Sequence, residues 1–177
     1  MRLGFKFKNL CGTVYKCGDV VFTSDGNRLL SPVGNRITCF DLVNHSSVTF
    51  AFESRKNISR VCLSPDDKLL VVVDVDGRAI VASMHSRRVL HRFNFKAPVK
   101  CISFSPCSRY IAVSHQNKVQ IWFSPPLHRE FSPFELHKQF GGHYDVVTAV
   151  CWSPCSRFIV TGSRDRSLRI NAVGRYP

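Results

Sequence analysis

The residues of this sequence that could support metal or redox chemistry are its cysteines. Eight occur among 177 residues, but no two form a Cys-x-x-Cys pair. Cys11 and Cys17 are six residues apart, and Cys151 and Cys155 are four apart. No histidine pair at zinc-finger spacing accompanies them. We therefore predict that all eight are reduced thiols, that no metal is bound, and that the protein resides in a nuclear or cytosolic compartment.

Catalytic motifs are also absent from the sequence. It has no Gly-rich phosphate loop, no Gly-x-Ser-x-Gly elbow and no paired-histidine motif. Residues 74–77 begin like a calcium loop, but the twelfth position is His85, which lacks the carboxylate that a bidentate ligand needs. Glutamate occurs at only three positions. The sequence predicts a protein that is not an enzyme, with no catalytic residue, no cofactor and no small-molecule substrate.

The arginines are the stronger functional lead. The chain has 25 Lys and Arg against 12 Asp and Glu, a formal net charge of +13. Such an excess favours a polyanionic partner, and the alternative is a solvated basic surface that aids solubility. Arginine suits phosphate because its planar fork donates two hydrogen bonds at once. The candidate contacts to RNA or to an acidic partner are Arg87, Arg88, Arg92, Arg129, Phe131, Arg164, Arg166 and Arg169.

A repeated pattern indicates which elements would position these residues. Residues 141–170 are typical of three short antiparallel strands joined by tight turns. Related turns, 41, 41 and 48 residues apart, begin at Thr23, Ser64, Ser105 and Ser153. A second turn follows each by 12 residues and contains Asn35, Asp76, Asn117 and Asp165. A period of about 40–45 residues with four strands per repeat is that of a propeller blade.

The repeat divides the chain into units. We predict one domain over residues 1–177, with units at about 9–52, 57–95, 97–140 and 141–177 and a strand at 1–8 that could close a ring. Outer strands are predicted at 48–52, 89–95 and 134–140. Three prolines make residues 124–133 a loop, which is either partner-facing or a tolerated insertion. The longest aliphatic run, residues 69–73, is too short to span a membrane.

The Gly-His pair, the Ser-Pro turns and the Asp before a strand resemble the WD-repeat β-propeller family. The resemblance implies an all-β, incomplete propeller, about four blades of a larger ring, and we expect the chain to be a fragment of a longer protein. It also implies a structural hydrogen-bond set of His143, Thr161 and Asp165 with a tryptophan, for which Trp122 is the candidate. His143 is therefore interpreted as structural and not catalytic.

A closer resemblance extends over nearly the whole chain. The N-terminal part of the periodic tryptophan protein 2 family resembles residues 9–15, 31–42, 87–96, 162–165 and the insertion at 129–134, and 31–42 is the most specific stretch. That family supplies a nucleolar WD-repeat subunit of the small-subunit processome.

The resemblance implies a non-catalytic scaffold subunit of a nucleolar ribonucleoprotein that acts in small-subunit ribosomal RNA processing and ribosome biogenesis. The implied partners are other processome WD-repeat proteins, small nucleolar RNA and pre-ribosomal RNA, and the implied location is the nucleus and nucleolus. The alternative is a generic WD-repeat adaptor, such as a ubiquitin-ligase substrate receptor, which has no need of a net charge of +13.

Overall fold

The computed structural model describes residues 19–128 and 133–174, and within these ranges the secondary structure consists of β-strands joined by turns. The predicted strand at 1–8 lies outside the described residues. The strands form four antiparallel sheets, which we number as blades 1 to 4. Blade 1 contains β1 (Val21–Phe22), β2 (Arg28–Val33), β3 (Arg36–Asp41) and β4 (Ser46–Thr49). Blade 2 contains β5 (Ile58–Leu63), β6 (Leu69–Asp74), β7 (Arg78–Ser83) and β8 (Val89–Asn94).

The second half of the chain repeats this arrangement. Blade 3 contains β9 (Val99–Phe104), β10 (Tyr110–His115), β11 (Lys118–Phe123) and β12 (Leu136–Phe140). Blade 4 contains β13 (Val147–Trp152), β14 (Phe158–Ser163) and β15 (Leu168–Ala172). In each blade the strands are paired in chain order, so each sheet is a simple meander.

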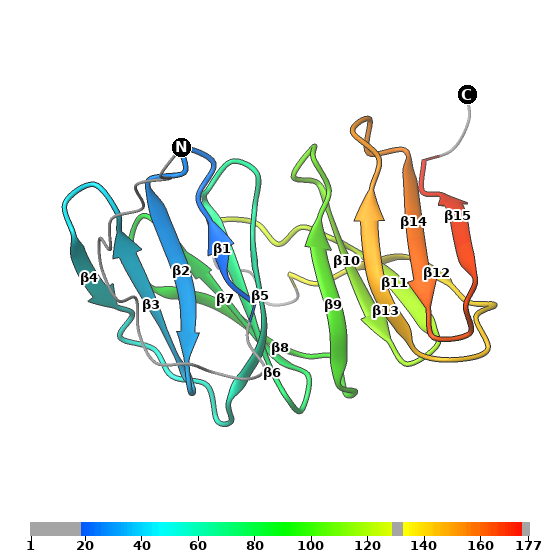
Figure 1. Cartoon of the computed structure of the whole chain (residues 1–177), viewed down its shortest axis with the longest axis horizontal. Coiled ribbons are helices and arrows are strands. Elements are labelled where there is room, and N and C mark those ends of the chain that lie inside the picture. The colour runs from blue at the N-terminus through cyan, green and yellow to red at the C-terminus, as the bar shows by residue number, and fades with distance from the viewer. Residues whose placement is uncertain (1–18, 129–132, 175–177) are drawn as a thin grey trace, which may run out of the picture.

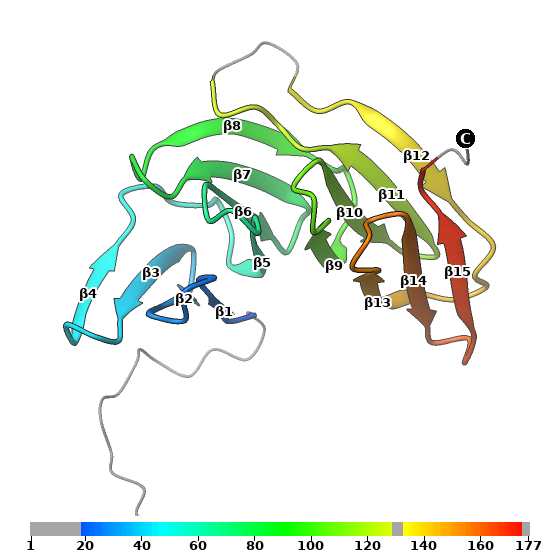
Figure 2. The ribbon, with the colours of Figure 1, turned by 90° about the horizontal axis from the view of Figure 1, so that it is seen from above.

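The four blades stand side by side in an open arc (Figures 1 and 2). The first strand of each blade lies on the inside of the arc, and the last strand lies on the outside (Figure 2). Turns after the first and third strands of a blade lie at one end of the arc, which we call the upper end (Figure 1). The turn after the second strand and the connection to the next blade lie at the lower end. The described strands thus form an all-β, incomplete β-propeller.

The turn after the first strand is built in the same way in all four blades, although it begins Ser-Pro in blades 2 to 4 and Thr-Ser in blade 1. The hydroxyl of the first turn residue accepts a hydrogen bond from the backbone N–H five residues on. The four bonds run from Arg28 to Thr23 (3.1 Å), Leu69 to Ser64, Tyr110 to Ser105 and Phe158 to Ser153 (3.0 Å each). The fourth turn residue has positive φ in every case: Gly26, Asp67, Ser108 and Ser156. This side-chain acceptor fixes the start of each second strand.

The apolar core lies between the blades. Strand β6 is buried on both faces because it stands between two neighbouring blades. Leu70 and Val72 pack in a cluster with blade 1, whereas Val71 and Val73 pack in a cluster with blade 3. A third cluster joins blades 3 and 4, and it includes Ile121. The period of two along each central strand therefore serves two interfaces at once.

All three predicted outer strands have different bounds in the structure, although β8 differs only by ending one residue earlier, at Asn94. In blade 1 the strand ends at Thr49, because Phe50 and Phe52 turn into the cluster between blades 1 and 2. In blade 3 it begins at Leu136, because Phe134 leaves the sheet and stacks on Phe93 with 4.3 Å between ring centroids. Burial of aromatic rings between blades thus decides where these outer strands pair.

Apolar side chains are exposed at both ends of the arc. Phe22 on β1 is 60% exposed, and Leu168 and Ile170 on β15 are 77% and 71% exposed. The faces that carry them have no neighbouring blade among the described residues (Figure 2). No helix within 19–128 and 133–174 is long and apolar enough to cross a membrane.

Candidate nucleic-acid and partner interface

His143, Thr161 and Asp165 meet in blade 4. His143 lies in the lower connection before β13, Thr161 lies on β14, and Asp165 lies in the turn before β15. The imidazole Nδ1 is 3.0 Å from Asp165 Oδ2, and Nε2 is 2.9 Å from Thr161 Oγ1. Because a carboxylate only accepts, Nδ1–H donates to Asp165, and Nε2 accepts from the Thr161 hydroxyl. The histidine is 5% exposed and has a partner on each nitrogen, an arrangement that fixes the blade edge.

Asp165 accepts further hydrogen bonds from its own turn. Its carboxylate receives the Ser167 hydroxyl at 2.6 Å, the Ser167 N–H at 2.9 Å and the Tyr144 N–H at 3.0 Å. The Ser167 hydroxyl is the largest influence, and together with the backbone donors and His143 it holds the pKa of Asp165 well below its usual value. The carboxylate is therefore fixed in its charged form as the centre of the turn.

Trp122 does not belong to this set, which corrects the prediction. It lies on β11 in blade 3, and its ring packs edge-on against Phe93 with 5.1 Å between centroids. Its indole Nε1 is buried without a hydrogen-bond partner among the described residues. In blade 4 the equivalent position on β15 is Asn171. The position that the family pattern gives to a tryptophan therefore serves aromatic packing in blade 3.

Blade 2 contains a related set that the sequence reading missed. Ser54 precedes its first strand by 58 − 54 = 4 residues, as His143 does in blade 4 by 147 − 143 = 4. The Ser54 hydroxyl donates to Asp74 Oδ2 at 3.2 Å. Asp74 Oδ1 accepts the N–H groups of Asp76 (3.0 Å) and Arg78 (2.9 Å), and its side chain is completely buried. A shared spacing from the first strand is the signal that could have revealed this set.

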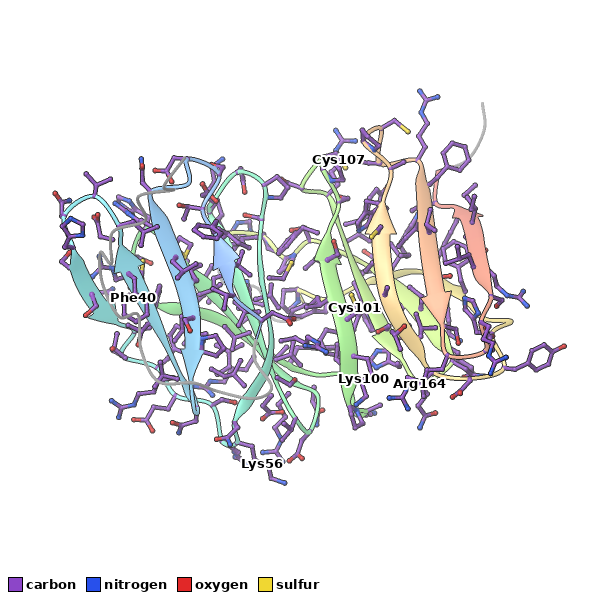
Figure 3. The ribbon with its side chains drawn as sticks, viewed as in Figure 1. Phe40, Lys56, Lys100, Cys101, Cys107 and Arg164 are labelled. Atoms are coloured by element: carbon purple, nitrogen blue, oxygen red, sulfur yellow. The ribbon has the colours of Figure 1, made fainter. Side chains whose placement is uncertain are left out.

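The predicted arginine contacts lie at both ends of the arc. Arg87 and Arg88 are exposed in the upper turn between β7 and β8, whereas Arg164 and Arg166 are exposed in the lower turn between β14 and β15. Figure 3 shows Arg164 at the same end as Lys56 and Lys100, with Cys107 at the opposite end. The structure therefore separates these arginines into two basic surfaces and does not gather them into one.

The remaining candidates have different surroundings. Arg92 is exposed on the outer strand β8. Arg169 is half-buried on β15 beneath the connection before β13, where a Cβ at Gly142 would lie 2.5 Å from its Nη1. Its Nε is buried and unpaired among the described residues. Arg129 and Phe131 lie outside the described residues.

The start of the insertion packs against blade 2 at the upper end. His91 on β8 hydrogen-bonds to the carbonyl oxygen of Pro126 through Nε2 at 3.1 Å. A cavity of about 500 Å³ lies beside it, lined by residues of blades 2 and 3 that include Arg109, Tyr110 and Leu127. The start of the insertion thus places an apolar side chain, Leu127, in the wall of a surface cavity between blades 2 and 3.

The described cysteines are all free, and those with a shifted thiol pKa fall into two classes. Burial raises the pKa of Cys62, on β5, to about 12, and burial also raises that of Cys101. At the upper turns the Ser153 hydroxyl lowers the pKa of Cys155. At Cys107 burial raises the pKa of the thiol. Hydrogen bonds with Ser105 and Ser156 outweigh burial, so the pKa of Cys107 is also lowered. No group of three potential metal ligands occurs among the residues that the structure describes.

Family models match two parts of the chain. Residues 134–170 match the model for the WD domain, G-beta repeat, and residues 35–107 match the anaphase-promoting complex subunit 4 WD40 domain. A chain of the crystal structure of the mitotic checkpoint complex superposes with a TM-score of 0.74 at 14% identity, covering 89% of this chain and 46% of that one. At this identity the likeness shows the fold alone.

Curated relatives match nearly the whole chain. Periodic tryptophan protein 2 of Saccharomyces cerevisiae is 46% identical over 98% of this chain and 19% of its own length. The Schizosaccharomyces pombe homolog is 45% identical over 98% of this chain and 20% of its own length. The Mus musculus homolog is 43% identical over 99% of this chain and 19% of its own length. This chain spans about a fifth of the length of these relatives.

Proposed function

This chain belongs to the periodic tryptophan protein 2 family, and from that premise we propose that it is a scaffold subunit of a nucleolar ribonucleoprotein complex for small-subunit ribosomal RNA processing. Its role in this proposal is to present stable surface to other WD-repeat proteins and to small nucleolar and pre-ribosomal RNA, without catalysis. The observation that carries the proposal is the similarity to the family along almost the entire chain.

The charge distribution supports the RNA part of the proposal. A net charge of +13 attracts a polyanion, and exposed arginines stand in turns at both ends of the arc. At the lower end, Lys100 and Arg164 extend from different blades (Figure 3). Turns held by a rigid sheet place such cations at fixed positions, which suits contacts with successive phosphates of a nucleic-acid strand.

The proposal is tested by tagging the chain in cells, recovering its complexes and sequencing the RNA that co-purifies. We expect enrichment of a small nucleolar RNA and of pre-ribosomal RNA, together with nucleolar fluorescence of the tagged chain. The rival proposal, a generic WD-repeat adaptor, predicts ubiquitin-ligase components and no enrichment of these RNAs. That second result would overturn the proposed function.

A salt titration tests for direct RNA contact. We compare Arg164→Gln/Arg166→Gln at the lower end with Arg87→Gln/Arg88→Gln at the upper end, so that each variant controls for the charge change of the other. Each phosphate contact with single-stranded RNA contributes about 0.7 to the slope of log K against log salt. We expect the slope to flatten by about 0.7–1.4 in the variant that loses the contacts. Unchanged slopes in both variants would exclude these four arginines as RNA contacts.

A further inference from the structure

A cavity of about 410 Å³ lies near the lower end of blade 2, on the side that faces blade 1. Its distinctive feature is that three arginine side chains line it, from three different segments: Arg55, Arg78 and Arg92. Arg55 belongs to the connection between blades 1 and 2, Arg78 begins β7, and Arg92 lies on β8. The remaining lining residues are Ser54, Asp74, Ala79, Ile80, Phe93 and Asn94.

The register of β7 and β8 explains why the side chains meet. Arg78 pairs with Asn94, and Ile80 pairs with Arg92. Residues two apart on a strand, and residues directly opposite on its neighbour, share one face of the sheet. Ile80 packs in the cluster with blade 1, so Arg78 and Arg92 lie on the face of blade 2 toward blade 1. The connection that carries Arg55 passes this same face.

The nearby carboxylates already have partners. Glu53 pairs with Arg36, and Asp76 pairs with Lys56 at 3.0 Å. Asp74 is held by the Ser54 hydroxyl and by two backbone N–H groups. In contrast, the guanidinium groups of the three cavity arginines form no hydrogen bond or ion pair with any described residue. Three arginines whose guanidinium groups have no partner among the described residues therefore line one open cavity.

We propose that this cavity binds the phosphate monoester of a phosphorylated side chain on a partner protein. Three arginines and one aspartate give the cavity a formal charge of +2. A phosphorylated serine or threonine carries about −1.5 to −2 at pH 7 and has three terminal oxygens, so charge and acceptor number both match. Proteins commonly bind phosphate monoesters with clusters of arginine, because each guanidinium group can donate two parallel hydrogen bonds to the phosphate oxygens.

The same features favour a phosphorylated protein over an internal segment of RNA. A phosphodiester has one charge and two terminal oxygens, which would leave one arginine without an acceptor. Proteins that bind single-stranded RNA also provide aromatic side chains on which the bases stack. The one aromatic residue that lines the cavity, Phe93, has its ring stacked on Phe134, with 4.3 Å between centroids, in the core between blades 2 and 3.

The experiment measures fluorescence anisotropy of labelled peptides on the 177-residue chain. One peptide pool has a fixed central phosphoserine and degenerate flanks, and the other has serine at that position. We expect the phosphorylated pool to bind at least about tenfold more tightly. In Arg55→Gln/Arg78→Gln/Arg92→Gln this preference should disappear. The matched control is Arg28→Gln/Arg109→Gln/Arg157→Gln, which removes three exposed arginines at the upper end and should keep the preference.

Circular dichroism establishes that each variant is folded. Should the glutamine variant unfold, Arg55→Lys/Arg78→Lys/Arg92→Lys keeps the charge and loses the forks, and the preference should fall at least about threefold. Equal binding of both pools to the unsubstituted chain overturns the proposal, as does a preference that survives in both cavity variants. A third arm uses a 12-nucleotide RNA without terminal phosphate. If RNA binding alone falls in the cavity variants, the cavity is a nucleic-acid site and the proposal is wrong.

Discussion

At the scale of single residues, blade 4 depends on a carboxylate that accepts hydrogen bonds from three residues in two segments. Asp165 accepts from His143, from Tyr144 and from Ser167, and so it ties the connection before β13 to the turn before β15. Thr161 then joins the opposite side of the imidazole to β14. A network in which each buried member has a partner stabilises more strongly than its separate bonds suggest.

The first prediction concerns His143→Ala. The substitution leaves Thr161 and Asp165 without their shared partner, and the cost of a buried group that loses its hydrogen bond lowers the free energy of unfolding by about 2 kcal/mol. Urea denaturation followed by fluorescence measures the change. His85→Ala, in an exposed upper turn, is the control and should alter stability by less than about 0.5 kcal/mol. Equal stability of the two variants would show that the network contributes nothing.

The second prediction concerns the pH dependence of Asp165. Its pKa in the folded chain lies below the usual value near 3.8, so its ionised form stabilises the fold. That contribution is complete above the unfolded pKa and is lost as the pH falls through the folded pKa. The stability gap between the unsubstituted chain and Asp165→Asn should therefore be constant from pH 7 to about 5 and should narrow below about pH 4.

Urea midpoints at pH 7, 5, 4 and 3 measure this gap. Ser167→Ala removes the largest influence on the Asp165 pKa and so raises the folded pKa toward the unfolded value, and in that background the gap should therefore narrow less between pH 5 and pH 3. If the stability difference between the unsubstituted chain and Asp165→Asn stayed constant down to pH 3, the folded pKa of Asp165 would not be lowered and the prediction would be wrong.

Part of the hydrogen-bond set in blade 4 could be predicted from the sequence, and the rest could not. His143, Thr161 and Asp165 occupy the positions that the WD-repeat pattern gives to this hydrogen-bond set, so the resemblance to that family placed them together in one blade. Trp122 was misassigned because spacing does not say whether an indole N–H finds a partner. The Ser54–Asp74 bond was missed because serine and aspartate are common turn residues, and only burial distinguishes these two.

At the scale of elements, the sequence predicts the positions of the turns, but it predicts the bounds of the outer strands only approximately. The hydroxyl of Ser105 and its counterparts organise each turn through local bonds, which short sequence patterns encode. The bounds of β4 and β12 depend instead on Phe50 and Phe134, whose rings enter cores formed with other blades. Local propensity does not contain that information.

The third prediction compares two glycines in turns. A Cβ at Gly77 would lie 2.0 Å from the carbonyl oxygen of Ala97, which is backbone and does not swing away, and the residue has φ +85°. Gly26 has a similar φ of +68° but nothing within 4 Å. We expect Gly77→Ala to lower the free energy of unfolding by about 3 kcal/mol or more, and Gly26→Ala by about 1 kcal/mol. Thermal and urea unfolding of both variants measure the difference, and equal losses would mean that the close approach to Ala97 is unimportant.

At the scale of the whole molecule, the contacts between blades could not be predicted from the sequence. The Asp67 carboxylate accepts the N–H of Ser24 from the preceding blade at 2.9 Å, and the Ser156 hydroxyl accepts the N–H of Cys107 at 3.1 Å. These pairs are 43 and 49 residues apart. The arginine cavity likewise joins residues of the connection between blades to β7 and β8. Such sites arise only once the blades stand next to each other.

The last prediction follows from the alternation along β6. Val71 and Val72 are neighbours with the same side chain and almost no exposure, yet Val71 packs toward blade 3 and Val72 toward blade 1. In a structure of stacked repeats, stability is the sum of repeat and interface contributions, so a cavity weakens the interface on which it opens. Val71→Ala and Val72→Ala should each cost about 2 kcal/mol. Their effects should nevertheless appear in different places.

Hydrogen exchange with mass spectrometry separates the two. In Val71→Ala, amides of β9 and β10 should exchange at least about tenfold faster, while those of β2 and β3 change little. In Val72→Ala the pattern should reverse. Uniform acceleration in both variants would mean that the four blades unfold as one cooperative unit, because a defect at either interface would then reach every strand equally. Opposite patterns would establish that each interface contributes separately to holding the arc together.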